Sequence, residues 1–289
     1  RSFANAQNRF TIRADASAVF LRLSGRTPPR RSPTFKEARV SLITTLLLLL
    51  VVLVTATVSG VFGMAGGLML MGALTLAMPV SAAMFTHGAV QFVSNGWRAV
   101  LHRKHINWRI ILLYGVGSAI AAALLALVVY EPTKAWVFLL LGLVPGLAWI
   151  PKGRFNLDAS KPAHAIACGL SVTGLNVLAG VSGPLLDVFF VRTALTRHQI
   201  VATKAATQAF SHTVKMIFYG APLLGLTNTG MPPWYFFAIA APLAMIGAWL
   251  GGMVLDRMSD VNFQKWTRWI VSAIGVIYLI QAAQLFAAG

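Results

Sequence analysis

The run of residues 40–62, VSLITTLLLLLVVLVTATVSGVF, is the feature that most constrains this chain, because it holds no charged residue in 23 positions. A helix of that length crosses the roughly 30 Å hydrocarbon core of a bilayer. The rest of the chain has the same character: 57% of its residues are hydrophobic, 11% are charged, and the mean hydropathy is +0.72. The sequence therefore predicts an all-α polytopic membrane protein.

Further apolar runs, separated by turn signals, predict more spans. They cover residues 80–101, 108–130, 134–150, 163–181, 199–220, 233–255 and 262–286. With the first run, they give about eight transmembrane helices. Two other apolar pieces, 66–78 and 184–195, are too short to span, so we expect broken or re-entrant helices there.

The net charge of +17 is the second constraint. Most cations fall in short loops, as the positive-inside rule expects, which favours a bacterial inner membrane over a nucleic-acid partner. The single Cys168 forbids an internal disulfide, and His102 and His105 lie beside cations without a carboxylate, so no metal site is expected. Phosphate-loop and dinucleotide fingerprints are absent, so we expect no cofactor.

Residues 1–39 differ from the rest, since they are rich in Arg, Ser and Ala and poor in acids. This composition fits a basic disordered leader, a transit peptide or an over-long translated start. Beyond them we expect a first transmembrane repeat at 40–151, a basic connecting loop at 152–162 and a second repeat at 163–289.

This division of the chain is based on an internal repeat. Sliding the chain by 117 residues aligns 63–98 with 180–215 without a gap. Eight of the 36 positions are then identical: Gly63/Gly180, Gly66/Gly183, Leu68/Leu185, Ala77/Ala194, Thr86/Thr203, Ala89/Ala206, Gln91/Gln208 and Ser94/Ser211. Such repeats are typical of secondary transporters, whose sites form where the repeats meet.

The orientation of the two repeats is left open by the sequence. Basic loops on the inner side require the second repeat to be inverted, which needs an odd number of crossings per repeat. Four spans per repeat do not give one. Either a short helix crosses, or a nominal span does not.

The aligned segments carry matching polar faces at helical spacing. The face of the first repeat holds His87, Gln91, Ser94, Asn95 and Arg98. That of the second holds Lys204, Gln208, Ser211, His212 and Lys215. Ionisable groups inside a membrane are costly and indicate a functional site, although hydrogen bonding between helices and snorkelling at helix ends are the alternatives.

Glycine breaks precede both faces, as GVFGMAGGL at 60–68 and GVSGPL at 180–185. Helices that start after Gly66 and Gly67, and at Gly183 and Pro184, expose free N–H groups that attract anions. The predicted substrate site therefore comprises Gly66, Gly67, His87, Gln91, Ser94, Gly183, Pro184, Lys204, Gln208 and Ser211. Asp187, His87 and His212 are the candidates for proton coupling, with a salt bridge as the alternative role of Asp187.

The segments GVFGMAGGLMLMGALTLAMPVSAAMFTHGAVQFVSNGWRAVLHRKHINWR and GVSGPLLDVFFVRTALTRHQIVATKAATQAFSHTVKMIFYG resemble the two repeats of the sulfite exporter TauE/SafE family, also called TSUP. The likeness covers about residues 41–286. It implies transport of sulfur-containing anions such as sulfite, sulfonates or sulfoacetate.

The sequence thus predicts a secondary transporter, not an enzyme, that exports a small sulfur-containing anion by means of the proton motive force. Its partners are the anion, protons, the lipid bilayer and a second copy in a homodimer. An anion channel is the alternative. An intramembrane serine protease that uses Ser182 with His212 or His164 is the minor alternative.

Overall fold

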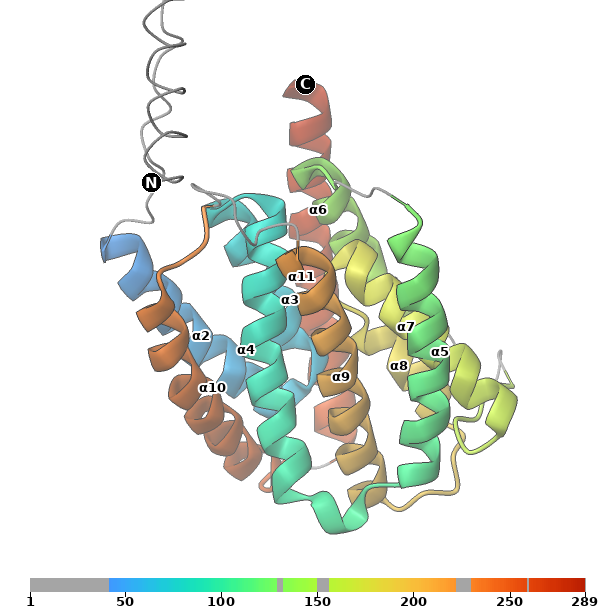
Figure 1. The fold of residues 1–289 in the computed structure, drawn as a ribbon. Coiled ribbons are helices and arrows are strands. Elements are labelled where there is room, and N and C mark those ends of the chain that lie inside the picture. Colours follow the sequence, from blue (N-terminus) through green and yellow to red (C-terminus); the bar gives the residue numbers. More distant parts are fainter. Residues whose placement is uncertain (1–41, 129–131, 150–155, 222–229, 259, 289) are drawn as a thin grey trace, which may run out of the picture. The chain divides into compact units, whose positions relative to one another are not determined.

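The computed structural model describes residues 42–128, 132–149, 156–221, 230–258 and 260–288, and every regular element in these ranges is a helix (Figure 1). In chain order the elements are α2 (Leu42–Phe62), α3 (Met64–Ala77), α4 (Val80–Leu101), η1 (Arg103–His105), α5 (Trp108–Ala126), α6 (Lys134–Leu143), η2 (Val144–Trp149), α7 (Pro162–Ala179), α8 (Gly183–Phe190), α9 (Arg197–Gly220), α10 (Trp234–Leu255) and α11 (Asp260–Ala288). The leader predicted at 1–39 and part of the loop predicted at 152–162 lie outside the described residues.

Five helices in the described ranges are long and apolar enough to cross a membrane: α2, α5, α7, α10 and residues 265–288 of α11. Helices α4 and α9 have 22 and 24 residues, but their polar stripes lower their hydropathy. Helix α6 has only 10 residues before η2 begins. All-helical, membrane-type architecture is therefore confirmed, whereas the count of eight spans stays a prediction.

The outward faces of the long helices are apolar. On α5 the exposed large side chains follow one stripe with a spacing of four residues: Trp108, Leu112, Val116, Ile120 and Leu124. Helix α10 likewise exposes Trp234, Ile239, Ile246 and Trp249. A water-facing helix would place polar residues there, so lipid is the solvent that suits this surface.

Each glycine break reverses the direction of the chain. Gly63 has φ 63° and ends α2, and α3 then packs back along α2, where a Cβ on Gly66 would overlap Thr55 and Ser59. Gly180 has φ 84° and ends α7. Helix α8 then runs back, so that the Ala159 N–H donates to the Phe189 carbonyl at 2.9 Å. Both breaks therefore form helical hairpins.

The two polar helices, α4 and α9, lie side by side and antiparallel (Figure 1). Phe85 near the start of α4 lies against Gly220 at the end of α9. At the other end, the Asn107 N–H, which follows α4, donates to Thr203 Oγ1 of α9 at 3.0 Å. Their long mutual contact fixes the relative position of all the side chains on the two polar faces.

The remaining contacts are reciprocal when the helices are matched by their order in the chain. Helix α2 packs on α10, and α7, its counterpart, packs on α5. Glycines make both approaches close, since a Cβ on Gly251 would overlap the backbone of α2 and one on Gly117 would overlap that of α7. Helices α6 and α11 pair antiparallel, with Trp136 against Phe286 at one end and Trp149 bonded to Ser272 at the other.

Several helix boundaries repeat after 117 residues, as the aligned sequences do. Helices α2 and α7 end at Phe62 and Ala179, and α4 and α9 begin at Val80 and Arg197, each pair 117 residues apart. The matched helices α4 and α9 are antiparallel, which is the relation that an inverted second repeat requires.

Candidate functional site

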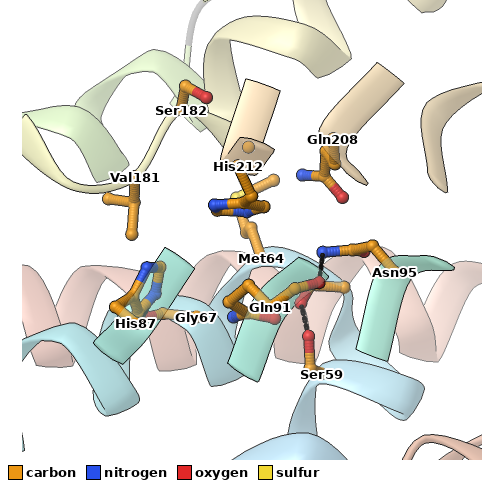
Figure 2. A pocket seen from close by; sticks show the side chains of 12 residues that line it. Ser59, Met64, Gly67, His87, Gln91, Asn95, Val181, Ser182, Gln208 and His212 are labelled. Atoms are coloured by element: carbon orange, nitrogen blue, oxygen red, sulfur yellow. Dashed lines mark hydrogen bonds between the residues drawn. The ribbon is translucent and has the colours of Figure 1, made fainter. Parts of the chain in front are cut away.

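One cavity lies between the two glycine breaks, bounded by both polar helices (Figure 2). Its volume is about 30 Å³, which is room for about two water molecules. In Figure 2 the residues of the second repeat face those of the first across the cavity. The lining consists of Ser59, Gly63, Met64, Gly67, His87, Gln91, Asn95, Val181, Ser182, Gly183, Gln208 and His212.

The first break presents two helix ends. Helix α3 starts after Gly63, so the predicted start after Gly66 and Gly67 is wrong and both glycines lie in its first turn. It has no side-chain cap, so its first N–H groups have no partner within the helix. At the end of α2, the Ser59 carbonyl accepts from the Gly63 N–H at 2.9 Å and from Arg98 Nη2 at 3.3 Å. The Arg98 cation thus satisfies the negative end of α2, and the positive end of α3 faces the cavity.

The second break repeats this arrangement with different residues. Helix α8 starts after Ser182, again with no side-chain cap, and Pro184 occupies its first turn. The Asn176 carbonyl accepts from the Gly180 N–H at 3.0 Å, and the Gly180 carbonyl accepts from Lys215 Nζ at 2.9 Å. Lys215 aligns with Arg98, so each polar helix supplies one cation to the end of the hairpin helix in its own repeat.

His87 joins the two repeats. Its Nε2 lies 3.0 Å from the Gly67 carbonyl of α3, and its Nδ1 lies 2.6 Å from Lys215 Nζ of α9. A carbonyl only accepts, so Nε2 carries the proton and Nδ1 accepts from Lys215. The ring is 1% exposed, so its orientation is fixed by these two bonds.

His212 lies on the opposite wall, with its ring centroid 5.5 Å from that of His87. Asn176 Nδ2 lies 3.3 Å from His212 Nδ1 and donates to Ser211 Oγ at 2.8 Å. The Oδ1 atom of Asn176 is buried and has no hydrogen-bond partner in the described part of the chain. An unsatisfied buried acceptor of this kind is suited to a bound water or a protonated ligand group.

Six of the residues predicted from sequence line the cavity together. They are Gly67, His87, Gln91, Gly183, Gln208 and His212. Gln91 and Gln208 occupy matched positions of the two repeats, as do Asn95 and His212. The two halves of the predicted site therefore meet.

The other predicted residues lie outside the lining. Gly66 packs against α2, and Pro184 is buried in the first turn of α8. Ser94 Oγ is buried without a described partner, and Ser211 accepts from Asn176. Lys204 forms an ion pair with Asp187, and their side chains are 28% and 39% exposed. The alternative role of Asp187, a salt bridge, is thus the one observed.

Sequence reasoning missed several lining residues, chiefly Ser59, Met64, Asn95 as a ligand, and Val181. Ser59 lies in the most apolar run of the chain, where one hydroxyl does not stand out. Extending the 117-residue alignment upstream would have paired Ser59 with Asn176 and marked both as polar groups one turn before a break.

The electrostatic character of the cavity suits an anion. The described lining includes no carboxylate, while Arg98 and Lys215 each contact a lining residue directly. Two uncapped helix starts and the amides of Gln91, Gln208 and Asn95 supply N–H donors. Donors of this type bind oxyanions through several convergent hydrogen bonds.

A family model described as sulfite exporter TauE/SafE matches residues 48–278. This chain belongs to the sulfite exporter TauE/SafE family. Comparison with curated proteins gave no match, and comparison with solved structures gave none either. The resemblance found in the repeat motifs is confirmed, and with it the chain is an integral membrane protein of a family of sulfur-anion transporters.

Proposed function

We propose that this TauE/SafE protein is a secondary transporter that carries small sulfur-containing anions through the cavity between its two glycine breaks. The observation that carries the proposal is the shared lining: Gly67 and Gln91 from one repeat face Gly183 and Gln208 from the other. A site at the junction of two antiparallel repeats is open to alternate exposure on the two sides of a membrane.

In this proposal the anion head lies between the starts of α3 and α8. Gln91 and Gln208 donate hydrogen bonds from opposite walls, and His87 and His212 complete the shell. Arg98 and Lys215 supply positive charge from behind the lining. Lys204 acts at a distance, because its ion pair with Asp187 fastens α8 to α9.

We also infer that the chain is built from two repeats in inverted orientation, each with a hairpin, a polar helix and two further helices. The antiparallel pairs α4/α9 and α6/α11 and the reciprocal pairs α2/α10 and α5/α7 support this. The location that fits the distribution of cations is a bacterial inner membrane.

A flux panel in proteoliposomes tests the transport proposal. Purified protein is reconstituted, and uptake of sulfite, thiosulfate, taurine, sulfoacetate and sulfate is measured with and without a pH gradient, beside protein-free vesicles. We expect saturable uptake of at least one sulfur anion and export when the gradient is reversed. Unitary currents under voltage clamp would favour a channel instead.

Proteolysis is the second function to test, because Ser182 and His212 line the same cavity. We expect the Ser182→Ala variant to retain anion uptake within about threefold of wild type, since Ser182 caps no N–H of α8 with its side chain. Loss of cleavage of membrane substrates in that variant, in a protein without anion flux, would favour the protease.

A further inference from the structure

Lys215 is a completely buried cation on α9 whose contacts reach both repeats. Its side chain is 0% exposed. The ammonium donates to His87 Nδ1 at 2.6 Å and to the Gly180 carbonyl at 2.9 Å. Both acceptors are neutral, and no carboxylate of the described residues contacts it. His87 separates Lys215 from the cavity by a single side chain.

The titratable groups around Lys215 are few. On α4 it meets His87, and on α9 the nearest is His212, whose ring lies 5.5 Å from that of His87. Helix α7 contributes the Gly180 carbonyl and the neutral Asn176, which lies beside His212. The buried Tyr219 lies one turn further along α9 and donates to the Val177 carbonyl. The Lys204–Asp187 pair is eleven residues away on α9, or about 16 Å along the helix.

A buried charge with only neutral partners is costly unless an opposite charge arrives. When the cavity is empty, a proton on the Lys215–His87 pair leaves an uncompensated positive charge. When an anion occupies the cavity, that charge lies one side chain away from it. Proton binding and anion binding therefore each make the other more favourable.

We propose, on the basis of the transport function above, that Lys215 and His87 together form the proton-binding site and that the proton and the anion bind and move together. One proton from the aqueous side joins the pair when the anion binds, and leaves with it on the other side. Co-binding means that the alkaline side of the membrane accumulates the anion. The proton-driven export predicted from the sequence would instead need proton and anion to exclude each other and move in opposite directions.

Arg98 of the first repeat is the structural counterpart with which Lys215 can be compared. Arg98 occupies the matched position, contacts Ser59 of its own repeat at 3.3 Å and carries a guanidinium that does not release its proton in proteins. Only the cation of the second repeat can exchange a proton, and only that cation contacts an imidazole. The two repeats thus differ at this pair of positions in whether the cation can release a proton.

The test compares net uptake of labelled sulfite with sulfite–sulfite exchange, using the full chain in proteoliposomes. Net uptake is driven by a pH gradient at zero membrane potential, and exchange is measured at equal pH on both sides. Net movement must bind and release the proton, whereas exchange need not. Protein-free vesicles correct for passive permeation.

In wild type, an alkaline interior is expected to accelerate net uptake at least tenfold over an acidic interior. Lys215→Arg, which keeps the charge, is expected to lower the ratio of net uptake to exchange at least tenfold. His87→Gln, which keeps an acceptor for Lys215, is expected to do the same. Lys204→Arg, a charge-conserving change on the same helix at a partly exposed pair with Asp187, is expected to leave the ratio within about twofold of wild type.

Faster wild-type uptake into an acidic interior would overturn co-binding. If Lys215→Arg or His87→Gln folded and kept the wild-type ratio of net uptake to exchange, the pair would not be the proton-binding site. If wild type showed neither uptake nor exchange of any panel anion, the transport function itself would fail, which is a different result from a coupling failure.

Discussion

The two glycine breaks have one plan but are fastened differently. The short helix of the first, α3, is held by buried neutral contacts: Tyr278 Oη of α11 donates to the Leu68 carbonyl at 2.9 Å, and His87 bonds Gly67. The short helix of the second, α8, has buried apolar side chains and accepts a bond from the Ala159 N–H, but its side-chain tether is the partly exposed pair of Lys204 and Asp187. The same position of the polar helix, 87 or 204, makes the tether in both.

This difference assigns unequal roles to the two halves of the cavity. Buried hydrogen bonds resist opening, because an unpaired partner then bears the full desolvation cost. A partly exposed ion pair contributes little, since water replaces it at small cost. We therefore expect α3 to be the fixed wall of the site and α8 to be the wall that yields during transport.

The largest expected effects are at the matched glycines 63 and 180, for different reasons. Gly180 has φ 84° and ψ −19°, a left-handed conformation that costs a residue with a Cβ about 1–2 kcal/mol, and a Cβ there would also lie 2.8 Å from Met71 Sδ. Gly63 has φ 63° and ψ −97°, which lies outside the left-handed helical region, and a Cβ there meets nothing within 4 Å. Both variants to alanine should therefore be destabilised, Gly63→Ala by backbone strain alone and Gly180→Ala by backbone strain and overpacking.

Thermal unfolding in detergent, followed by tryptophan fluorescence, measures this comparison. Gly63→Ala and Gly180→Ala should each lower the midpoint or cause a loss of monodisperse protein. A wild-type midpoint for Gly63→Ala would contradict the backbone strain at the first break, and one for Gly180→Ala would contradict the tight packing of the second.

The two cavity glutamines provide the next comparison. Gln91→Ala and Gln208→Ala each remove one donor to the anion, and a hydrogen bond to a charged group is worth about 1.5–3 kcal/mol. Each variant should therefore lower sulfite uptake at subsaturating concentration by about tenfold or more. If one variant kept wild-type uptake and the other lost it, the anion would be shown to bind to one repeat only.

The buried hydroxyl of Tyr278 tests the fixed wall. Tyr278→Phe removes the bond to the Leu68 carbonyl, which keeps its helical bond within α3, so the expected cost in stability is about 0.5–1.5 kcal/mol. The unfolding midpoint should decrease, and uptake should decrease with it because α3 loses its position. An unchanged midpoint would contradict the view that α3 is held by α11.

Removal of the ion pair of the second break should have a smaller effect on stability and uptake. Lys204→Met and Asp187→Asn are each expected to change stability by at most about 1 kcal/mol, because both side chains are partly exposed. Uptake should decrease by less than about fivefold, and the double charge reversal should restore it. A loss as large as that of Gln208→Ala, not restored by the reversal, would place Lys204 at the anion.

Substitution of the matched serines, Ser94 and Ser211, should have the smallest effect on stability. Ser211 accepts from Asn176, so Ser211→Ala should cost about 1 kcal/mol, whereas Ser94 Oγ has no partner in the described residues and Ser94→Ala should be nearly neutral. Unfolding midpoints of the two variants check this order. A larger loss for Ser94→Ala would indicate a ligand or water bound at that hydroxyl.

Much of this arrangement could be predicted because the sequence contains the glycine break and the polar helix twice. The repeat located both breaks and both glutamines, and the apolar runs located the helices to within a few residues. Which polar side chain faces the cavity could not be predicted, because helical periodicity groups Ser94 with Asn95 and Lys204 with Gln208. Their roles depend on partners such as Asp187 and Asn176, which lie on other helices.

The central claim is that the anion binds between the two breaks. It is tested most directly by the initial rate of labelled sulfite uptake into proteoliposomes that contain the Gln91→Ala, Gln208→Ala double variant, at matched protein content and with wild type alongside. The account predicts a loss of at least 100-fold while the variant remains folded and monodisperse. A folded double variant with the wild-type rate would contradict it.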